Sequence, residues 1–280
     1  MKITHIELLL LRGVAPFSHG SFSPLVVRLC TDEGLLGYGE LSMAIGSSRN
    51  EAIGAVRDIA RWLGVPLYQL LGGKMREEFP CYASQLQFGW HNGDSKAVTG
   101  EALARQAVEA AAQGYRWIKF DPFGYSPDGV WKGWPLRGAL PSETVREICS
   151  RVAAVRDAVG GQMQIILENH CLTDAQSAVT LIRALEGYHI DYYEEVCTPI
   201  NHAVWADVRK HTDAGLCTGE KLVTQSGFLP YIVGRTVDML QPDLGICGGV
   251  SEIMPICAMA ELYDIGVSLH TCHSPISIAA

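Results

Sequence analysis

Ionisable side chains recur at a regular interval in the second half of the chain, each at the end of a short apolar run. Glu168, Glu194, Glu220, Asp243 and His270 follow one another at intervals of 26, 26, 23 and 27 residues. An interval of this length fits one β-strand and one helix joined by short loops. Because parallel strands repeated in this way end on the same face, we expect the five side chains to share that face.

The chain from Phe79 onward alternates short apolar runs with longer amphipathic stretches, the pattern of parallel βα units. Strands are predicted at YRWIKF, MQIILEN, DYYEEV, GLCTGEK, DMLQPD and GVSLHT. Helices are predicted over residues 100–113, 141–159, 173–185, 203–211 and 249–263. Strict alternation allows a (β/α) barrel or a doubly wound sheet. The regular strand ends favour the barrel, and no GxGxxG motif follows the first strand.

The N-terminal region has a different pattern. Ile3–Leu11, Leu25–Thr31 and LLGYGE predict an antiparallel meander, and the loop over residues 13–24 is a candidate flap. Residues 50–63 have helical spacing. We therefore expect a shortened α+β capping domain over residues 1–76 and a barrel domain over residues 77–280.

Composition excludes several classes of function. The net charge is −8 and no stripe of Lys or Arg could follow a phosphate backbone, so no nucleic-acid partner is expected. No uncharged apolar run reaches the roughly 18 residues of a membrane helix. The nine cysteines are scattered without a CxxC pair, which favours a reducing cytoplasm.

The three glutamates at successive strand ends predict a metal site. A single strand-end Glu is commonly a solvated surface group, but three that converge would repel one another without a cation. Oxygen ligands suit a hard divalent ion, and Mg²⁺ is the expected one. In YYEEV the pattern alone does not choose between Glu194 and Glu195; Glu194 faces the metal if Tyr193 packs against the helices.

The next two strand ends predict an acid–base pair. Asp243 would fix the tautomer of His270 and raise its basicity, so that His270 serves as a general base. Lys119 ends the strand before Glu168 and would add a positive charge that holds a substrate carboxylate. His273, in HTCH, is interpreted as incidental.

Taken together and in order, the motifs resemble those of the enolase superfamily, in the mandelate racemase subgroup and its acid-sugar dehydratases. The resemblance spans nearly the whole chain. It rests on TDEGLLGYGE, GVPLYQLLGG, KFDPFG, LENH, YYEEV, TGEKL, QPDLGICGG and LHTCHSPISIAA.

The resemblance implies a modified (β/α) TIM-type barrel with an α+β capping domain, and an enzyme that removes the proton α to a substrate carboxylate with the help of Mg²⁺. It assigns the three glutamates as metal ligands and Asp243 with His270 as the catalytic pair. Lys119 matches the first lysine of the family's K-x-K motif, but Asp121 stands at the second position, which argues against racemisation. Proteins of this kind are often homo-oligomers.

His170 directs the expected reaction toward dehydration. It lies two residues after Glu168 and matches a histidine that related dehydratases use as a general acid. After His270 removes the α-proton, His170 would protonate the departing 3-hydroxyl of an aldonate and yield a 2-keto-3-deoxy acid. Asp121, Asn169 and His19 complete the site as predicted substrate-binding residues, and Asn169 would also tie the strand end to its neighbour.

Two alternatives remain open at this level. The chain could be an epimerase or cycloisomerase of the same superfamily, or a non-catalytic relative that binds only metal or a sugar acid. The capping region is shorter than the family pattern, and an eighth strand is expected at roughly residue 295, beyond Ala280. Both domains are therefore expected to be incomplete in these 280 residues.

Overall fold

The computed structural model describes residues 2–10, 25–41, 64–90, 97–126, 130 and 136–272. The chain divides into two compact units. The first unit comprises Met1–Phe79, Gly219–Val233 and Leu240–Ala280, and the second comprises Pro80–Thr218 and Gly234–Met239. The division into a capping domain and a barrel domain at residues 76 and 77 stays a prediction.

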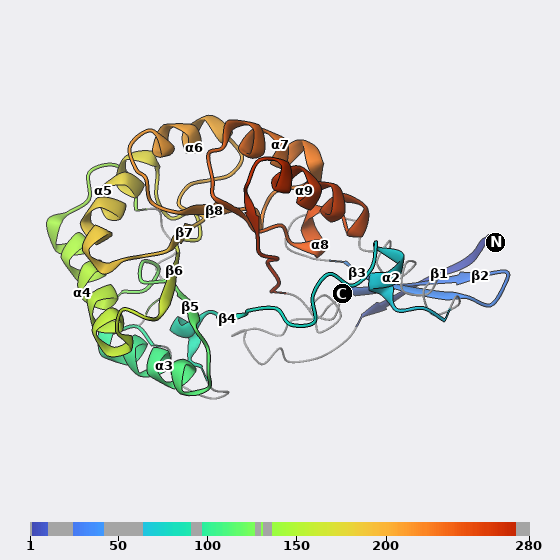
Figure 1. Ribbon diagram of the computed structural model, residues 1–280, viewed down its shortest axis with the longest axis horizontal. Coiled ribbons are helices and arrows are strands. Elements are labelled where there is room, and N and C mark those ends of the chain that lie inside the picture. Colours follow the sequence, from blue (N-terminus) through green and yellow to red (C-terminus); the bar gives the residue numbers. More distant parts are fainter. Residues whose placement is uncertain are drawn as a thin grey trace. The chain divides into compact units, whose positions relative to one another are not determined.

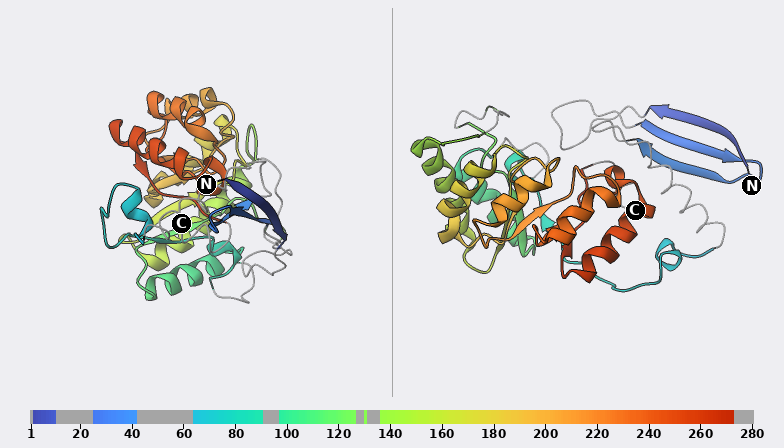
Figure 2. Two further views of the ribbon diagram at one scale, coloured as in Figure 1. Left: turned by 90° about the vertical axis from the view of Figure 1, so that its right-hand side faces the viewer. Right: turned by 90° about the horizontal axis from the view of Figure 1, so that it is seen from above.

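An antiparallel sheet forms the N-terminal part of the first unit (Figure 2, blue). Its strands, in the order β1-β2-β3, are β1 (Ile3–Leu10), β2 (Leu25–Thr31) and β3 (Leu36–Leu41). Gly34 has a φ of 78° in the turn between β2 and β3, a conformation that glycine adopts without strain. The predicted meander is confirmed. A short helix, α2 (Leu67–Leu70), follows, while the predicted helix over residues 50–63 lies outside the described residues.

The remaining strands belong to one seven-stranded sheet, and neighbours in the sheet are also neighbours along the chain. This order has no reversal, whereas a doubly wound sheet needs one at its ligand-binding crevice. The arrangement is that of a TIM-type barrel, which confirms the predicted fold class. The strands are β4 (Tyr82–Ala83), β5 (Trp117–Phe120), β6 (Gln164–Glu168), β7 (Tyr192–Glu194), β8 (Leu216–Thr218), β9 (Met239–Leu240) and β10 (Gly266–Val267).

Helices lie between successive strands, and Figure 1 shows α3 to α6 on one side of strands β5 to β8. The helices after β4 are α3 (Gly100–Ala112), α4 (Ser142–Val159), α5 (Ala175–Leu185), α6 (His202–Arg209), α7 (Thr224–Gly234), α8 (Leu244–Cys247) and α9 (Val250–Leu262). Two short 3₁₀ turns are η1 (Leu86–Phe88) and η2 (Glu186–Tyr188).

Side-chain caps set where several of these helices begin, among them α3 and α5. The Thr99 hydroxyl accepts a hydrogen bond from the Ala102 amide at the start of α3. At the start of α5, Asp174 and Ser177 form a reciprocal capping box. These caps stabilise the first turns of the helices that follow β4 and β6.

Candidate functional site

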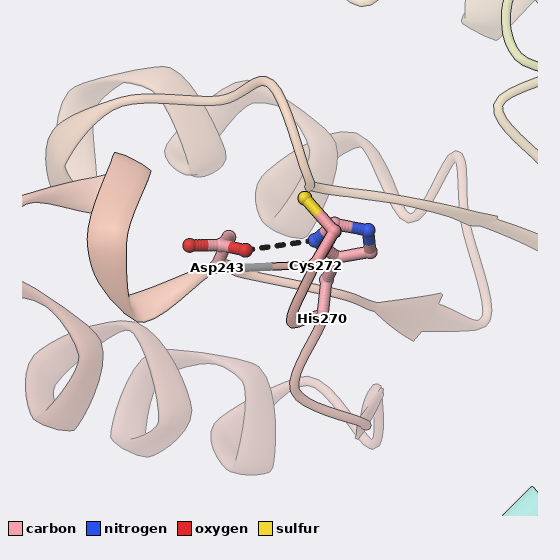
Figure 3. Close-up of side chains that lie close together, drawn as sticks. All are labelled: Asp243, His270 and Cys272. Atoms are coloured by element: carbon pink, nitrogen blue, oxygen red, sulfur yellow. Dashed lines mark hydrogen bonds and ion pairs between the residues drawn. The ribbon is translucent and has the colours of Figure 1, made fainter. Parts of the chain in front are cut away.

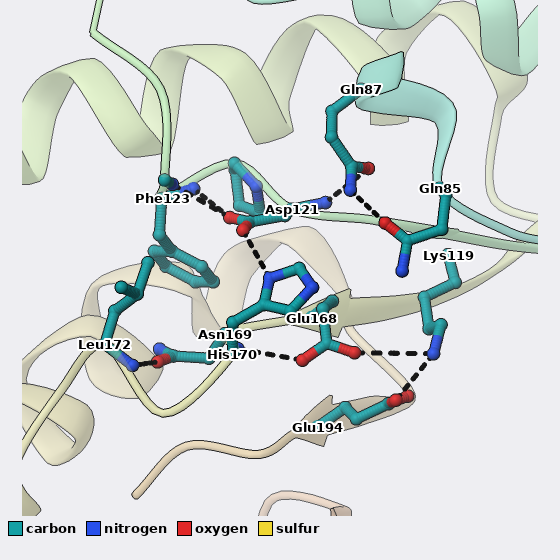
Figure 4. Close-up of polar contacts among 12 residues, drawn as sticks. Gln85, Gln87, Lys119, Asp121, Phe123, Glu168, Asn169, His170, Leu172 and Glu194 are labelled. Atoms are coloured by element: carbon teal, nitrogen blue, oxygen red, sulfur yellow. Dashed lines mark hydrogen bonds and ion pairs between the residues drawn. The ribbon is translucent and has the colours of Figure 1, made fainter. Parts of the chain in front are cut away.

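Two glutamates meet at the C-terminal ends of neighbouring strands in the second unit. Glu168 on β6 and Glu194 on β7 are partners in the parallel register, and both side chains are buried. Lys119 on β5 lies against both of them (Figure 4): its Nζ is 2.5 Å from Oε1 of Glu194 and 3.4 Å from Oε2 of Glu168. The structure therefore brings together three of the residues predicted from sequence.

Lys119 is held in its charged form by this pair. Burial alone would lower the pKa of its ammonium group, but the negative charges of Glu194 and Glu168 outweigh burial and hold the pKa well above its usual value. With both glutamates ionised, the three groups carry a net charge of −1. Two buried carboxylates that face one cation form an oxygen-rich cluster suited to a further hard cation.

The two glutamates of YYEEV have different surroundings, and the metal role of Glu194 stays a prediction. Glu194 faces Glu168 and Lys119, whereas Glu195 has a φ of 51° and turns its carboxylate to other partners. The Thr218 hydroxyl and the Cys171 thiol both donate to the Glu195 carboxylate. Tyr193, which precedes both glutamates, is buried, in agreement with the condition set from sequence.

His170 and Asp121 form a carboxylate–imidazole pair beside the two glutamates (Figure 4). Nδ1 of His170 lies 2.7 Å from Oδ2 of Asp121, and the His170 amide donates to Oε1 of Glu168 at 2.8 Å. The other oxygen of Asp121 accepts hydrogen bonds from the amides of Phe123 and Gly124. Because an ionised carboxylate can only accept a hydrogen bond, Nδ1 carries the proton in this contact, and Nε2 is the nitrogen that can take up or release a further proton.

Gln87 supports this pair and was not predicted from the sequence. Its side chain is fully buried, and its Oε1 accepts a hydrogen bond from the Asp121 amide at 3.1 Å. Its Nε2 donates to Oε1 of Gln85, which lies just after β4 with a φ of 63°. The position of this glutamine inside the apolar stretch LQF could have indicated a supporting role, because a buried side-chain amide needs hydrogen-bond partners.

The side chain of Asn169 forms hydrogen bonds within the turn that follows β6. Its Oδ1 accepts hydrogen bonds from the amides of Leu172 and Thr173, at 2.9 and 3.2 Å, and from the Thr173 hydroxyl. The side chain is buried and fixes the turn after β6. These contacts join Asn169 to its own turn and not to a neighbouring strand, so they do not support the predicted tie, and a substrate contact of Asn169 stays a prediction.

The first unit holds the second carboxylate–imidazole pair. Asp243 caps α8 by accepting from the Gly245 amide with Oδ1, and its Oδ2 lies 2.8 Å from Nδ1 of His270. A parallel β-bridge joins the two residues, and the His270 amide donates to the Pro242 carbonyl. On the other side of the ring, Nε2 of His270 is 3.1 Å from Oε2 of Glu220. The predicted contact between Asp243 and His270 is present, and Glu220 adjoins it.

The remaining sequence predictions concern two histidines, the membrane and the cysteines. His19 and His273 lie outside the described residues. In the ranges that are described, no helix has both the length and the apolar content to cross a bilayer. All nine cysteines are described, and none of them forms a disulfide.

Comparison with known proteins identifies the family. A family model described as "Enolase C-terminal domain-like" matches residues 102–280. A D-gluconate dehydratase of Thermoproteus tenax is 37% identical over 223 residues, which are 79% of this chain and 41% of the relative. A D-galactonate dehydratase of Ralstonia pickettii is 31% identical over 78% of this chain and 52% of its own length.

A solved structure extends the match to the fold. The crystal structure of an enolase superfamily member from Salmonella Typhimurium is 32% identical and has a TM-score of 0.92. The alignment covers 99% of this chain and 82% of that chain. The chain spans about half the length of the curated relatives it matches. On the family match, the strand order and this structural similarity, the chain belongs to the enolase superfamily.

Proposed function

We propose that this chain supplies the active site of a Mg²⁺-dependent dehydratase that acts on a sugar acid of the aldonate class. The observation that carries the proposal is a pair of carboxylate–imidazole contacts, Asp243 with His270 and Asp121 with His170, at barrel strand ends. Loss of water across two adjacent carbons needs one group to take a proton and another to give one. The names of the curated relatives support an aldonate as substrate.

His270 is the proposed general base. Its side chain is 10% exposed, and Asp243 holds its Nδ1 so that Nε2 is the atom that takes the α-proton. Asp243 also stabilises the imidazolium that forms, because the positive ring then faces an ionised carboxylate. Its second oxygen is fixed by the helix cap, so the pair is held in one orientation.

His170 is the proposed general acid, and Asp121 positions it. The ring is 26% exposed, which allows contact with a ligand, while the Asp121 carboxylate is buried and held by two backbone amides. As the general acid, His170 is an imidazolium whose Nδ1 proton stays with Asp121; donation of its Nε2 proton to the 3-hydroxyl lets that group leave as water and returns the ring to its neutral form. The resulting enol rearranges to a 2-keto-3-deoxy acid. We therefore prefer a positioning role for Asp121 to the substrate-binding role predicted from the sequence.

Glu168, Glu194 and Glu220 are the proposed Mg²⁺ ligands, with Lys119 as a nearby positive charge. The fit rests on the donor chemistry: Glu168 and Glu194 are buried, paired in register and offer only oxygen atoms. Glu220 follows the end of β8 by two residues. A bound Mg²⁺ supplies positive charge that offsets the negative charge developing on the substrate carboxylate as the α-proton leaves.

Glu194→Gln is expected to remove at least about half of the stabilisation that Mg²⁺ gives to the folded chain. At a Mg²⁺ concentration of 100 times its Kd, the unchanged chain should gain about 2.7 kcal/mol in the free energy of unfolding. Loss of one charged ligand should weaken binding at least about tenfold, which removes about 1.4 kcal/mol of that gain. Thermal unfolding with and without Mg²⁺ measures both values.

The matched control for Glu194→Gln is Glu101→Gln, which alters an exposed glutamate in the first turn of α3. The control should keep the full Mg²⁺ effect. An equal Mg²⁺ effect in Glu194→Gln and in the unchanged chain would remove Glu194 from the metal site.

A substrate panel tests the proposed function itself. The chain is incubated with Mg²⁺ and a set of C5 and C6 aldonates, and 2-keto acids are trapped with semicarbazide. We expect at least one aldonate to give product, and chelation of Mg²⁺ to stop it. Thermal stabilisation by Mg²⁺ without product from any aldonate would support a non-catalytic binding protein instead.

The proposal also includes the compartment, the oligomeric state and the partners of the protein. The cysteines, none of which forms a disulfide, fit a reducing cytoplasm. We also propose a homo-oligomer that acts on a small molecule and binds neither nucleic acid nor membrane, in keeping with the acidic charge balance.

A further inference from the structure

Cys272 places a thiol beside the pair formed by Asp243 and His270. One ligand atom from each of the three residues, a carboxylate oxygen, an imidazole nitrogen and the thiol sulfur, lies within 4.8 Å of the other two. Figure 3 shows the sulfur next to the ring, on the side of the nitrogen that faces Asp243. Asp243 is buried, while Cys272 is exposed, so the cluster has a rigid inner ligand and an outer one open to solvent.

This donor set differs in kind from the glutamate cluster. A thiolate and an imidazole select Zn²⁺ and similar soft or borderline cations, whereas Mg²⁺ takes oxygen ligands. Zn²⁺ bonds of about 2.0 to 2.3 Å place tetrahedral ligand atoms roughly 3.5 Å apart. Sγ of Cys272 would therefore have to approach by up to about 1 Å, which rotation of an exposed cysteine side chain can supply, while Nδ1 of His270 and Oδ2 of Asp243, now 2.8 Å apart, would have to separate by roughly 0.7 Å.

We propose that Asp243, His270 and Cys272 form a binding site for a thiophilic divalent cation of the Zn²⁺ class. The cation binds Nδ1 of His270, Oδ2 of Asp243 and Sγ of Cys272, and water takes a fourth position. The proton on Nδ1 transfers to Nε2, which faces Oε2 of Glu220 at 3.1 Å, and the thiol proton passes to solvent.

Occupation of this site would block the general base. Nδ1 of His270 would bond the cation instead of donating to Asp243, and Nε2 would carry a proton and could not accept one. Inhibition by Zn²⁺ is therefore expected, and this consequence rests on the proposed dehydratase function. The cation site itself does not, because its binding can be measured without turnover.

Cobalt(II) is the probe for the site, because a Co²⁺–thiolate bond gives a charge-transfer absorption band in the near ultraviolet. The chain is first saturated with Mg²⁺ and then titrated with Co²⁺ under reducing conditions. We expect the band to rise to one Co²⁺ per chain and Zn²⁺ to displace it. In Cys272→Ser the band should be absent. In Asp243→Asn, Co²⁺ should bind at least about tenfold more weakly, because loss of a residue that only hydrogen-bonds to a metal ligand already weakens metal binding by that factor.

The matched control is Cys81→Ser, which removes another exposed cysteine. It should keep the band, and unchanged thermal unfolding of both serine variants should show that they fold. A band that persists in Cys272→Ser, or no thiolate band in the unchanged chain, would overturn the site. If the unchanged chain turns over an aldonate, Cys272→Ser should keep that turnover, and the Zn²⁺ concentration that gives half inhibition should rise at least about tenfold. If the chain shows the band but no turnover, the dehydratase function is rejected and the cation site stands.

Discussion

Replacing His270 by asparagine is expected to lower turnover of the preferred aldonate by about 10²- to 10⁴-fold, the usual contribution of a positioned acid–base group. Asparagine can still accept a hydrogen bond or donate one to Asp243, but it cannot take the α-proton. The loss should appear in kcat, and the α-proton of the substrate should no longer exchange with deuterium from solvent. Initial rates of 2-keto acid formation and proton NMR of the recovered substrate measure the two effects.

A matched histidine separates loss of the base from general damage. His211→Asn changes an exposed histidine whose Nδ1 contacts the Asp207 carbonyl oxygen, and it should leave turnover unchanged. Mg²⁺ stabilisation of His270→Asn should stay close to that of the unchanged chain. If His270→Asn kept near-normal turnover, another residue would be the base.

Replacing His170 by asparagine is expected to separate the two halves of the reaction. Dehydration should fall by about 10²- to 10⁴-fold, because no group then protonates the departing 3-hydroxyl. His270 should still remove the α-proton and return a deuteron from solvent, so the substrate should become α-deuterated with retained configuration. Proton NMR in deuterated water follows exchange and dehydration in the same sample.

The backbone provides a close control for this variant. His170 and His189 both have a φ of 52°, a conformation that asparagine tolerates better than most residues. His189→Asn should therefore change neither exchange nor dehydration. Equal losses of exchange and dehydration in His170→Asn would argue that His170 supports the whole site rather than acting as the acid.

The spacing of polar residues predicted much of the second unit. Parallel strands of similar length bring their C-terminal ends together, so Lys119, Glu168 and Glu194 could be expected on one face, and the structure places them in contact. In the first unit, the contact of Asp243 with His270 followed from the same reasoning. In each case, the alternation of side chains along a β-strand determines to which face a residue points, so its direction can be predicted from the sequence.

Contacts made after the strand ends could not be predicted in this way. Asp121 was interpreted as a substrate-binding residue, but its partner His170 adopts a left-handed backbone conformation that breaks the strand period. Gln87 and Cys272 lie in a 3₁₀ turn and a loop, where no period relates residue number to direction. Helix α7 was not predicted either, because Pro230 interrupts a stretch without a clear polar face.

In the proposed reaction, His270 and His170 carry out one dehydration through separate proton transfers. Proton NMR of the chain with Mg²⁺ and its preferred aldonate in deuterated water tests it most directly, with His270→Asn and His170→Asn beside it. We expect a 2-keto-3-deoxy acid from the unchanged chain, α-deuterated substrate from His170→Asn and neither from His270→Asn. Exchange at the α-carbon by the unchanged chain without any dehydration would contradict it and identify an epimerase instead.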